Sequence, residues 1–467
     1  MKLQKIQAIE ELKKLNYSSI EPFLMEYKNE EIFFEKIVRI VPEKRVVAKG
    51  VFNDKRVVIK LFFGGEAEKH LKTEVSGYLL LEEKKILTPN LLVASELDIK
   101  DVYAAIFIEL YPVRFVEEYI KIKDDEKTLL WLKKIQQVIV ELHKNHIAQI
   151  DLHLDNFLIV SDHVCVVDYQ SIKTIDEKEQ SDNLALFYAQ LPLRISSMLP
   201  ELILDYNQAM ASELNQSDLM KKLEEYRCQR AQHLMKKTLR NSTKFYADQN
   251  ATVKFACKRE CVTPELLFFL NNPAEYIQTK EIEWIKKGNT CSVMKAKMND
   301  LMLVIKRYNT KDLQHFLTHF WRKSRAKRSW QFANVLELFA IPTPMPIGYI
   351  EEYYKGVRVS SYYIAIYRDG VLLNDALARN PDEKIMEKTV NVIHELETMK
   401  ISHGDMKATN FIVNDNEVFV IDFDAMKMHE DEKTWKEANR KDRLRFRKNW
   451  LEIPKIMKVF DYLLKKV

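Results

Sequence analysis

Apolar residues recur at helical spacing over residues 127–146, and two short β-branched runs follow at 157–160 and 164–168. The spacing predicts an amphipathic helix, and the two runs, separated by Ser-Asp-His, predict a β-hairpin. The same succession recurs late in the chain, where the runs 411–413 and 418–422 flank Asn-Asp-Asn. The pattern therefore predicts the same local unit, a helix, a loop and a hairpin, at two places.

Residues 141–173 and 395–427 form an internal repeat with an offset of 254 residues and no gap, in which ten positions are identical. A repeated packing scaffold would account for the apolar positions. It would not require three polar identities, two carboxylates and an amide, to stay in step, so these indicate function. They are Asp151, Asn156 and Asp168 in the first copy and Asp405, Asn410 and Asp422 in the second.

A lysine lies within an apolar, β-branched run upstream of each copy. Lys60 precedes Asp151 by 91 residues, and Lys306 precedes Asp405 by 99 residues. A single lysine in such a strand usually lies on its polar face, but two matched placements favour a functional role.

Glu74 lies in a helical stretch fourteen residues beyond Lys60 and is the expected ion-pair partner of that lysine. In the second half Ser329 aligns with Glu74, and Glu337 would require a shifted helix. The partner of Lys306 stays open.

The triad and the lysine together suit phosphoryl transfer. An amide and a carboxylate at the mouth of a hairpin suit Mg²⁺, which takes one or two protein carboxylates together with phosphate oxygens. A carboxylate shortly before the Asn can orient a hydroxyl and accept its proton. D-x-x-x-x-N followed by a strand-borne Asp is the arrangement of the protein-kinase-like fold. We expect an α+β protein of two tandem protein-kinase-like bilobal domains, each with a small antiparallel β N-lobe and a helical C-lobe.

The expected first domain covers residues 1–250, with its N-lobe at about 25–110 and its C-lobe at about 111–250, where residues 182–246 are predicted to be helical. Residues 251–284 are expected to connect the domains. The expected second domain covers residues 285–467, with its N-lobe at about 285–367 and its C-lobe at about 368–467.

Several motifs resemble one known family. They are RVVIKLF, TEVSGYLL and ILTPNLL in the first half, and AIPTPMPIG, HGDMKATNFIV and VIDFDAM in the second. They are similar to motifs of the Kdo/WaaP-type lipopolysaccharide kinase family, over about 40–175 and 285–450. The resemblance implies ATP- and Mg²⁺-dependent phosphorylation of a sugar hydroxyl, usually on Kdo or heptose of the lipopolysaccharide inner core.

The resemblance also implies a role for each site residue. The catalytic bases would be Asp151 and Asp405, the phosphate-binding lysines Lys60 and Lys306 with Glu74 orienting the first, and the metal ligands Asn156, Asp168, Asn410 and Asp422. Lys407, two residues after Asp405, is placed to neutralise the transferring phosphoryl group, and His153 holds that position in the first copy.

Each copy departs from the family pattern at a different point. Gln149 and Ile150 stand where the second copy has His403 and Gly404. The second copy thus keeps the better catalytic loop, whereas the first keeps the better Lys–Glu pair.

Two other functions stay open. One is a kinase of the same fold that acts on an aminoglycoside, choline or a protein, and the other is a pseudokinase scaffold with one or both clefts inactive.

Only nine glycines occur in 467 residues, and none forms a G-x-G-x-x-G or P-loop string. If the clefts bind a nucleotide, side chains such as Lys44, Arg45, Thr290 and Ser292 have to do part of the work of a glycine-rich loop.

The net charge of +5 is mild, but residues 226–246, 321–330 and 434–450 are basic runs. The ordinary interpretation is a solvated helix face. No nucleic-acid-binding motif accompanies the runs, so we expect no nucleic-acid partner. An anionic saccharide such as the lipopolysaccharide core, carried on an anionic membrane surface, fits the resemblance best.

The remaining composition concerns the compartment. Five scattered cysteines favour a reducing environment, and no apolar run approaches the ~20 residues that span a bilayer. Residues 1–20 are predicted to form an amphipathic helix rather than a signal peptide. We expect a cytoplasmic protein in peripheral contact with the inner face of the cytoplasmic membrane.

Overall fold

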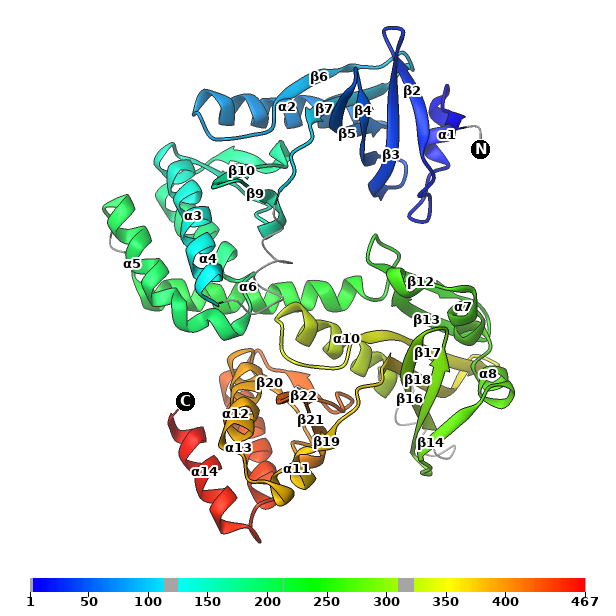
Figure 1. Ribbon diagram of the computed structural model, residues 1–467, viewed down its shortest axis with the longest axis vertical. Coiled ribbons are helices and arrows are strands. Elements are labelled where there is room, and N and C mark those ends of the chain that lie inside the picture. The colour runs from blue at the N-terminus through cyan, green and yellow to red at the C-terminus, as the bar shows by residue number, and fades with distance from the viewer. Residues whose placement is uncertain (1–2, 113–124, 213, 310–322, 467) are drawn as a thin grey trace. The chain divides into compact units, whose positions relative to one another are not determined.

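The computed structural model describes residues 3–112, 125–212, 214–309 and 323–466 (Figure 1). The chain divides into two compact units. The first comprises Met1–Leu191 and Ile195–Tyr226, and the second comprises Pro192–Arg194 and Arg227–Val467. Each unit combines sheets with helices, which confirms the mixed α+β class. The predictions that involve residues 113–124 and 321–322 lie outside the described residues.

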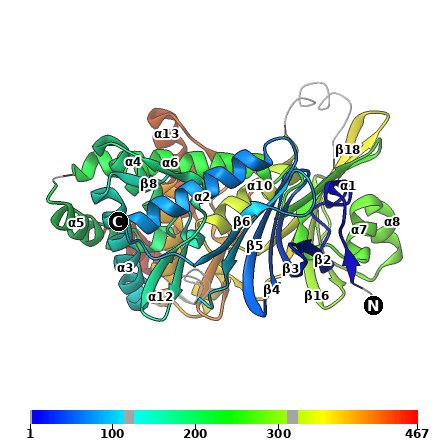
Figure 2. The same cartoon turned by 90° about the horizontal axis from the view of Figure 1, so that it is seen from above.

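Both units contain five antiparallel strands in the same spatial order, β3-β4-β5-β7-β6 in the first and β14-β15-β16-β18-β17 in the second. The strands of the first unit are β3 (Glu30–Val41), β4 (Arg45–Phe52), β5 (Lys55–Phe63), β6 (Leu91–Glu96) and β7 (Val102–Ile108). Those of the second are β14 (Ile282–Lys286), β15 (Cys291–Met298), β16 (Leu301–Asn309), β17 (Pro346–Tyr354) and β18 (Val357–Ile366). Figure 2 shows β3, β4 and β5 side by side. Alternate residues of β4 are buried, as the two-residue period of a strand requires.

The two sheets are extended to seven strands at opposite edges. In the first unit β1 (Gln4–Lys5) and β2 (Phe23–Tyr27) are added beside β3, and in the second β12 (Phe245–Gln249) and β13 (Val253–Lys258) are added beside β17. The division of the chain thus differs from the expected boundary at 250, because residues 245–258 pair with the second sheet.

Three predictions of local structure are wrong. The N-terminal helix is only α1 (Ile9–Lys13), because residues on either side of it join the first sheet. The basic run 226–246 is helical only as far as the end of α6 (Gln216–Lys237). The segment 251–284 is not a connection. It forms β13, α7 (Pro264–Asn271), α8 (Pro273–Thr279) and the start of β14, which share one buried core.

One long helix follows the third of the five strands in each unit. α2 (Ala67–Glu83) follows β5 and buries Leu71, Glu74 and Leu81. α10 (Arg325–Leu338) precedes β17 and buries Ser329 and Trp330. Both helices contact their own sheet.

The helical part of the first unit contains α3 (Asp125–Lys144), β8 (Ile147–Gln149), β9 (Phe157–Val160), β10 (His163–Val166), β11 (Ile172–Thr174), α4 (Glu177–Tyr188), α5 (Leu199–Met210) and the first half of α6. The predicted helix 127–146 and hairpin 157–168 are thereby found, within two residues at every end. The strands β9 and β10 pair in antiparallel fashion.

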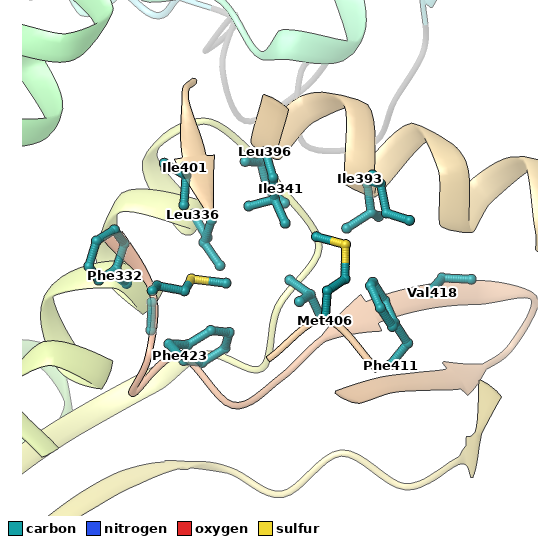
Figure 3. Packing of buried hydrophobic residues seen from close by; sticks show 14 of the residues in the cluster. Phe332, Leu336, Ile341, Ile393, Leu396, Ile401, Met406, Phe411, Val418 and Phe423 are labelled. Atoms are coloured by element: carbon teal, nitrogen blue, oxygen red, sulfur yellow. The ribbon is translucent and has the colours of Figure 1, made fainter. Parts of the chain in front are cut away.

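The corresponding part of the second unit contains β19 (Val371–Leu372), α11 (Leu373–Arg379), α12 (Glu383–Thr398), β20 (Ile401–Ser402), β21 (Phe411–Asn414), β22 (Glu417–Val420), β23 (Lys427–Met428), α13 (Glu432–Lys448) and α14 (Pro454–Lys466). Figure 3 shows Met406 among buried side chains from α12 and the β21–β22 hairpin. Met406 follows Asp405 directly, so this core anchors the loop that carries the carboxylate.

Candidate active site

The hairpin in each unit places the amide of the repeat beside the second carboxylate of the repeat. In the first unit Phe157 pairs with Val166, and the Val167 N–H donates to the backbone oxygen of Asn156 at 2.9 Å. In the second unit Phe411 pairs with Val420, and the Ile421 N–H donates to the backbone oxygen of Asn410 at 2.9 Å. Asn156 therefore lies next to Asp168, and Asn410 lies next to Asp422, as the sequence predicted.

The amide side chains also tie the hairpin to the loop of the first carboxylate. Asn156 Nδ2 donates to the backbone oxygen of Asp151 at 3.2 Å, and Asn410 Nδ2 donates to that of Asp405 at 2.7 Å. Since each NH₂ group is engaged in this way, the Oδ1 atom remains as an acceptor. An amide oxygen beside a carboxylate is a donor set that fits Mg²⁺ completed by phosphate oxygens.

Lys60 lies between two carboxylates in the first unit. Its Nζ is 2.5 Å from Glu74 Oε1 and 3.3 Å from Asp168 Oδ1, and Glu74 is fully buried on α2. Burial alone would raise the pKa of Asp168, but the charges of Lys60 and Arg45 outweigh it and hold that pKa below its ordinary value. The Lys60–Glu74 pair is the one that the spacing predicted.

Lys306 has a different environment. Its Nζ lies 2.8 Å from Asp422 Oδ1, and burial of Asp422, which would raise the pKa, is outweighed by Lys306, so the pKa is lowered. Neither of the two residues considered as a helix partner reaches Lys306. Ser329 contacts the Tyr308 hydroxyl at 3.4 Å, and Glu337 pairs with Lys258 at 2.6 Å.

The helix α10 contributes a cation instead of an anion. Arg325 Nε donates to Asp424 Oδ2 at 2.8 Å, and Arg328 Nη1 donates to the backbone oxygen of Asp424 at 2.9 Å. Burial, followed by the charge of Asp422, raises the pKa of Asp424, and Arg325 opposes that rise. In the second unit the helix is thus tied to the loop that follows Asp422 rather than to the strand lysine. The sequence analysis missed this contact.

A buried aspartate on α13 supports the catalytic loop of the second unit. The N–H of His403 donates to Asp442 Oδ2 at 2.7 Å, and the N–H of Gly404 donates to both Asp442 oxygens at 3.1 Å. His403 Nε2 lies 3.0 Å from the backbone oxygen of Ile421, to which it donates. Burial lowers the pKa of His403. Sequence reasoning did not identify Asp442, which follows the motif by almost forty residues.

Two basic side chains lie beside the Asp405 carboxylate. Lys407 Nζ is 3.0 Å from Oδ2, and Arg445 Nη1 is 3.7 Å from Oδ1. Arg445 also donates to the backbone oxygen of Gly404. Other arginines of the basic run 434–450 are paired with acids, Arg443 with Glu397 at 2.6 Å and Arg447 with Asp461 at 3.0 Å. The run is therefore in part a set of ion pairs, and its Arg445 reaches the loop of Asp405.

The first unit supports its loop with other residues. Gln149 Nε2 donates to the backbone oxygens of Val167 at 2.8 Å and Asp168 at 2.7 Å. Gln149 therefore makes the contact that His403 makes in the second unit, although it carries no ring. Ile150 has no aspartate on its N–H, which donates to the Ser171 backbone oxygen at 2.9 Å. The carboxylate of Asp151 is exposed, and no ion pair to it is found among the described residues.

A cavity of about 690 Å³ lies in the first unit between the sheet and the β9–β10 hairpin. Its lining includes Lys60, Asn156 and Asp168, together with the apolar side chains of Val47 and Phe107. The predicted site residues Lys60, Asn156 and Asp168 thus share one cavity. Within the described residues no group of three or more His, Cys, Asp or Glu side chains could hold a metal ion by itself. A magnesium site that phosphate oxygens complete needs fewer carboxylates.

Comparison with known proteins bears on the second unit. Residues 339–464 match the family model described as "Lipopolysaccharide core biosynthesis protein (WaaY)". This segment of the chain is therefore similar to that lipopolysaccharide core biosynthesis family, in agreement with the resemblance that its motifs show. The match contains Asp405, Lys407, Asn410 and Asp422.

A solved structure described as "WaaP in complex with acyl carrier protein" matches with 15% identity and a TM-score of 0.33, over 44% of this chain and 88% of that one. The comparison with curated proteins gives no match. Among the described residues no helix is both long and apolar enough to cross a membrane.

Proposed function

We propose that the chain transfers the γ-phosphoryl group of ATP, with Mg²⁺, to a sugar hydroxyl of the lipopolysaccharide inner core, on Kdo or heptose. The observation that carries the proposal is the arrangement around Asp405 in the second unit. The side chain of Asn410 is bonded to the backbone of Asp405, and the strand lysine Lys306 pairs with the strand-end Asp422. All of these residues except Lys306 lie within the segment that matches the family model.

Each side chain has a role that its contacts support. Asp405 orients the acceptor hydroxyl and takes its proton, while Lys407 and Arg445 lie where charge on the transferring group is neutralised. Lys306 binds phosphate oxygens, and Asn410 and Asp422 hold the metal. Bound Mg²⁺ supplies charge neutralisation on those oxygens. Positioning and electrostatics account for the rate, because phosphoryl transfer asks little covalent chemistry of the protein.

In this proposal each unit is a kinase-like bilobal domain, with the five-stranded part of each sheet as its N-lobe. The first unit holds the equivalent residues Asp151, Lys60, Glu74, Asn156 and Asp168. The protein acts at the cytoplasmic side of the inner membrane, in peripheral contact with its surface. An anionic saccharide carried there is the substrate that the basic run 434–450 suits.

The test is transfer of label from [γ-³²P]ATP to purified core oligosaccharide, with free sugars and casein as alternative acceptors. Asp405→Asn is expected to lower transfer to core oligosaccharide about a hundredfold or more, because it removes the proton acceptor. Asp415→Asn, the same change at an exposed turn of the same unit, is the matched control and leaves transfer unchanged.

Two outcomes would contradict the proposal. Transfer to casein or a free sugar in preference to core oligosaccharide would assign another substrate. Full activity in both Asp405→Asn and Asp151→Asn would show that neither carboxylate is catalytic and favour a scaffold.

A further inference from the structure

Four basic side chains line the cavity of the first unit: Arg39, Arg45, Lys49 and Lys60. They come from three neighbouring strands. Arg39 on β3 is opposite Val47 on β4, and Val47 is opposite Lys60 on β5. Arg45 lies two residues before Val47 and so projects from the same face. The strand register therefore gathers these cations on one wall of the cavity.

Two of the four cations are matched by acids and two are not. Lys60 pairs with Glu74 and Asp168, and Lys49 Nζ lies 2.5 Å from Glu109. Arg45 donates to the neutral Oε1 of Gln170 at 3.1 Å. For Arg39 no ion pair is found among the described residues. Burial and then the charge of Arg39 lower the pKa of Arg45, which Asp168 only partly offsets. Two guanidinium groups share a cavity without carboxylates of their own, and such an arrangement favours an anion.

The turn before β4 does not supply the backbone groups of a glycine-rich loop. The Lys44 N–H donates within the turn to Val41 at 3.1 Å, and the Lys44 backbone oxygen accepts from Phe63 at 3.0 Å. The side chain of Lys44 is exposed and does not line the cavity. Of the four side chains expected to replace a glycine loop, Arg45 is the one that lines this cavity. Ser292 is engaged with Gly288 in the second unit.

The second unit lacks this arginine. Val293 pairs with Lys306 there, as Val47 pairs with Lys60, and the residue two before it is Cys291. Lys286 is opposite Val293, so a cation is kept at the position of Arg39. Of these two corresponding positions, only the one in the first unit therefore carries a guanidinium group.

We propose that Arg45, with Arg39 and Lys60, forms a side-chain polyphosphate site that holds the diphosphate or triphosphate tail of a nucleotide in the first unit. The inference rests on the proposed function and names how this unit binds its nucleotide. A planar guanidinium donates two parallel hydrogen bonds to phosphate, which a lysine or a thiol cannot do. Val47, Val58 and Phe107 give the same cavity an apolar wall for a base, and about 690 Å³ is ample for a nucleotide. Because the cations belong to the protein, binding does not require Mg²⁺.

The test measures ADP binding to the full chain by calorimetry in EDTA, in a Lys306→Ala background that silences the second site. Arg45→Cys, which copies the second unit, is expected to weaken ADP binding about ten- to hundredfold. Arg45→Lys is expected to lose part of that affinity, because it keeps the charge and loses the fork. Lys44→Cys removes the same charge one residue away and is expected to change affinity less than about threefold.

Thermal unfolding of each variant shows whether it is folded, and Arg45→Lys provides a conservative variant if Arg45→Cys is not. Pyrophosphate is the second ligand. If pyrophosphate binds more weakly than ADP and depends on Arg45 in the same way, the result supports a nucleotide site. Equal affinity for both ligands overturns the assignment of the base to this cavity. Equal ADP binding by Arg45→Cys, Arg45→Lys and the parent overturns the inference.

The inference and the proposed function fail separately. Binding of ADP that depends on Arg45, in a chain that transfers no phosphate, would support the polyphosphate site and reject the kinase. Phosphate transfer in a chain whose ADP affinity does not depend on Arg45 would support the kinase and reject the polyphosphate site.

Discussion

Asp168 and Asp422 both adopt a left-handed backbone conformation, which aspartate and asparagine take more readily than other residues with a Cβ atom. Their φ angles are +68° and +70°, in the left-handed region, which costs a residue with a Cβ atom about 1–2 kcal/mol. Both residues directly follow the hairpin contact to Asn156 or Asn410, and both face a strand lysine. Strain of this kind persists where the surroundings enforce it, often at functional sites. Its presence at corresponding positions of both units supports the assignment of these carboxylates as metal ligands.

His143 makes the stability of the first unit depend on pH. The ring is fully buried, with Nδ1 2.8 Å from the Tyr206 hydroxyl and Nε2 3.2 Å from Asn183 Oδ1. Burial lowers its pKa to about 4. The unfolded chain, with a pKa of about 6.5, binds more protons between these values. The stabilisation is therefore full above about pH 6.5 and is lost as pH falls toward 4, by up to ~1.4 kcal/mol per pH unit and ~3 kcal/mol in all.

Calorimetric unfolding of the full chain at pH 7, 6 and 5 measures this loss. His143→Gln is expected to be less stable at pH 7 but to show a smaller loss between pH 7 and 5 than the parent. His163→Gln, at an exposed position of β10, is the control and keeps the parent's dependence. The same slope in His143→Gln and the parent would mean that another group titrates.

At the scale of single residues, the sequence predicted the site residues that lie within the repeat and those at matched distances before each copy of it. Lys60, Glu74 and Asp168 meet as expected because a strand, a helix and a hairpin each have a recognisable period. Asp442 and the Arg325–Asp424 pair could not be found in this way. Asp442 accepts from backbone N–H groups, which leave no mark in the sequence, and Arg325 lies 99 residues from its partner.

At the scale of elements, the loop between β20 and β21 depends on one glycine. Gly404 has φ +78°, and a Cβ atom there would lie 2.6 Å from the Ala425 backbone oxygen. Gly356 has the same φ of +78° but nothing within 4 Å of that position. Gly356→Ala is therefore expected to lose about 1–2 kcal/mol of stability from conformation alone. Gly404→Ala is expected to lose at least ~1 kcal/mol more, because backbone must move, and to lose phosphate transfer as well.

Chemical denaturation and the transfer assay, run on both variants, separate the two effects. The loss of transfer should be confined to Gly404→Ala, because only at this position does the backbone movement draw N–H groups away from Asp442. If the two alanine variants were alike in stability and in transfer, the steric contact with Ala425 would have no bearing on the site. Ile150 holds this position in the first unit without a positive φ, which shows that its loop follows another path.

At the scale of the whole molecule, the repeat was found from the sequence but its limits were not. The order of five strands is the same in both units, whereas the added edge strands differ. Local periodicity identifies a strand and not its neighbour, so nothing in residues 245–258 indicated pairing with a strand almost a hundred residues later. The boundary was placed too late for that reason.

The two units are unequal in a way that predicts their activities. Asp405 has two cations beside its carboxylate and a loop that Asp442 supports, whereas Asp151 is exposed and lacks both features among the described residues. The first unit in turn has the Lys60–Glu74 pair and the basic cavity. We expect Asp405→Asn to lower phosphate transfer to core oligosaccharide at least about tenfold more than Asp151→Asn, because general-base catalysis contributes ~10²–10⁴ where it operates. Initial rates at saturating ATP measure both losses, with Asp415→Asn and Asp162→Asn as exposed-turn controls in the second and first units. Equal losses would mean that both units contribute to the transfer, and a larger loss in Asp151→Asn would place the chemistry in the first unit.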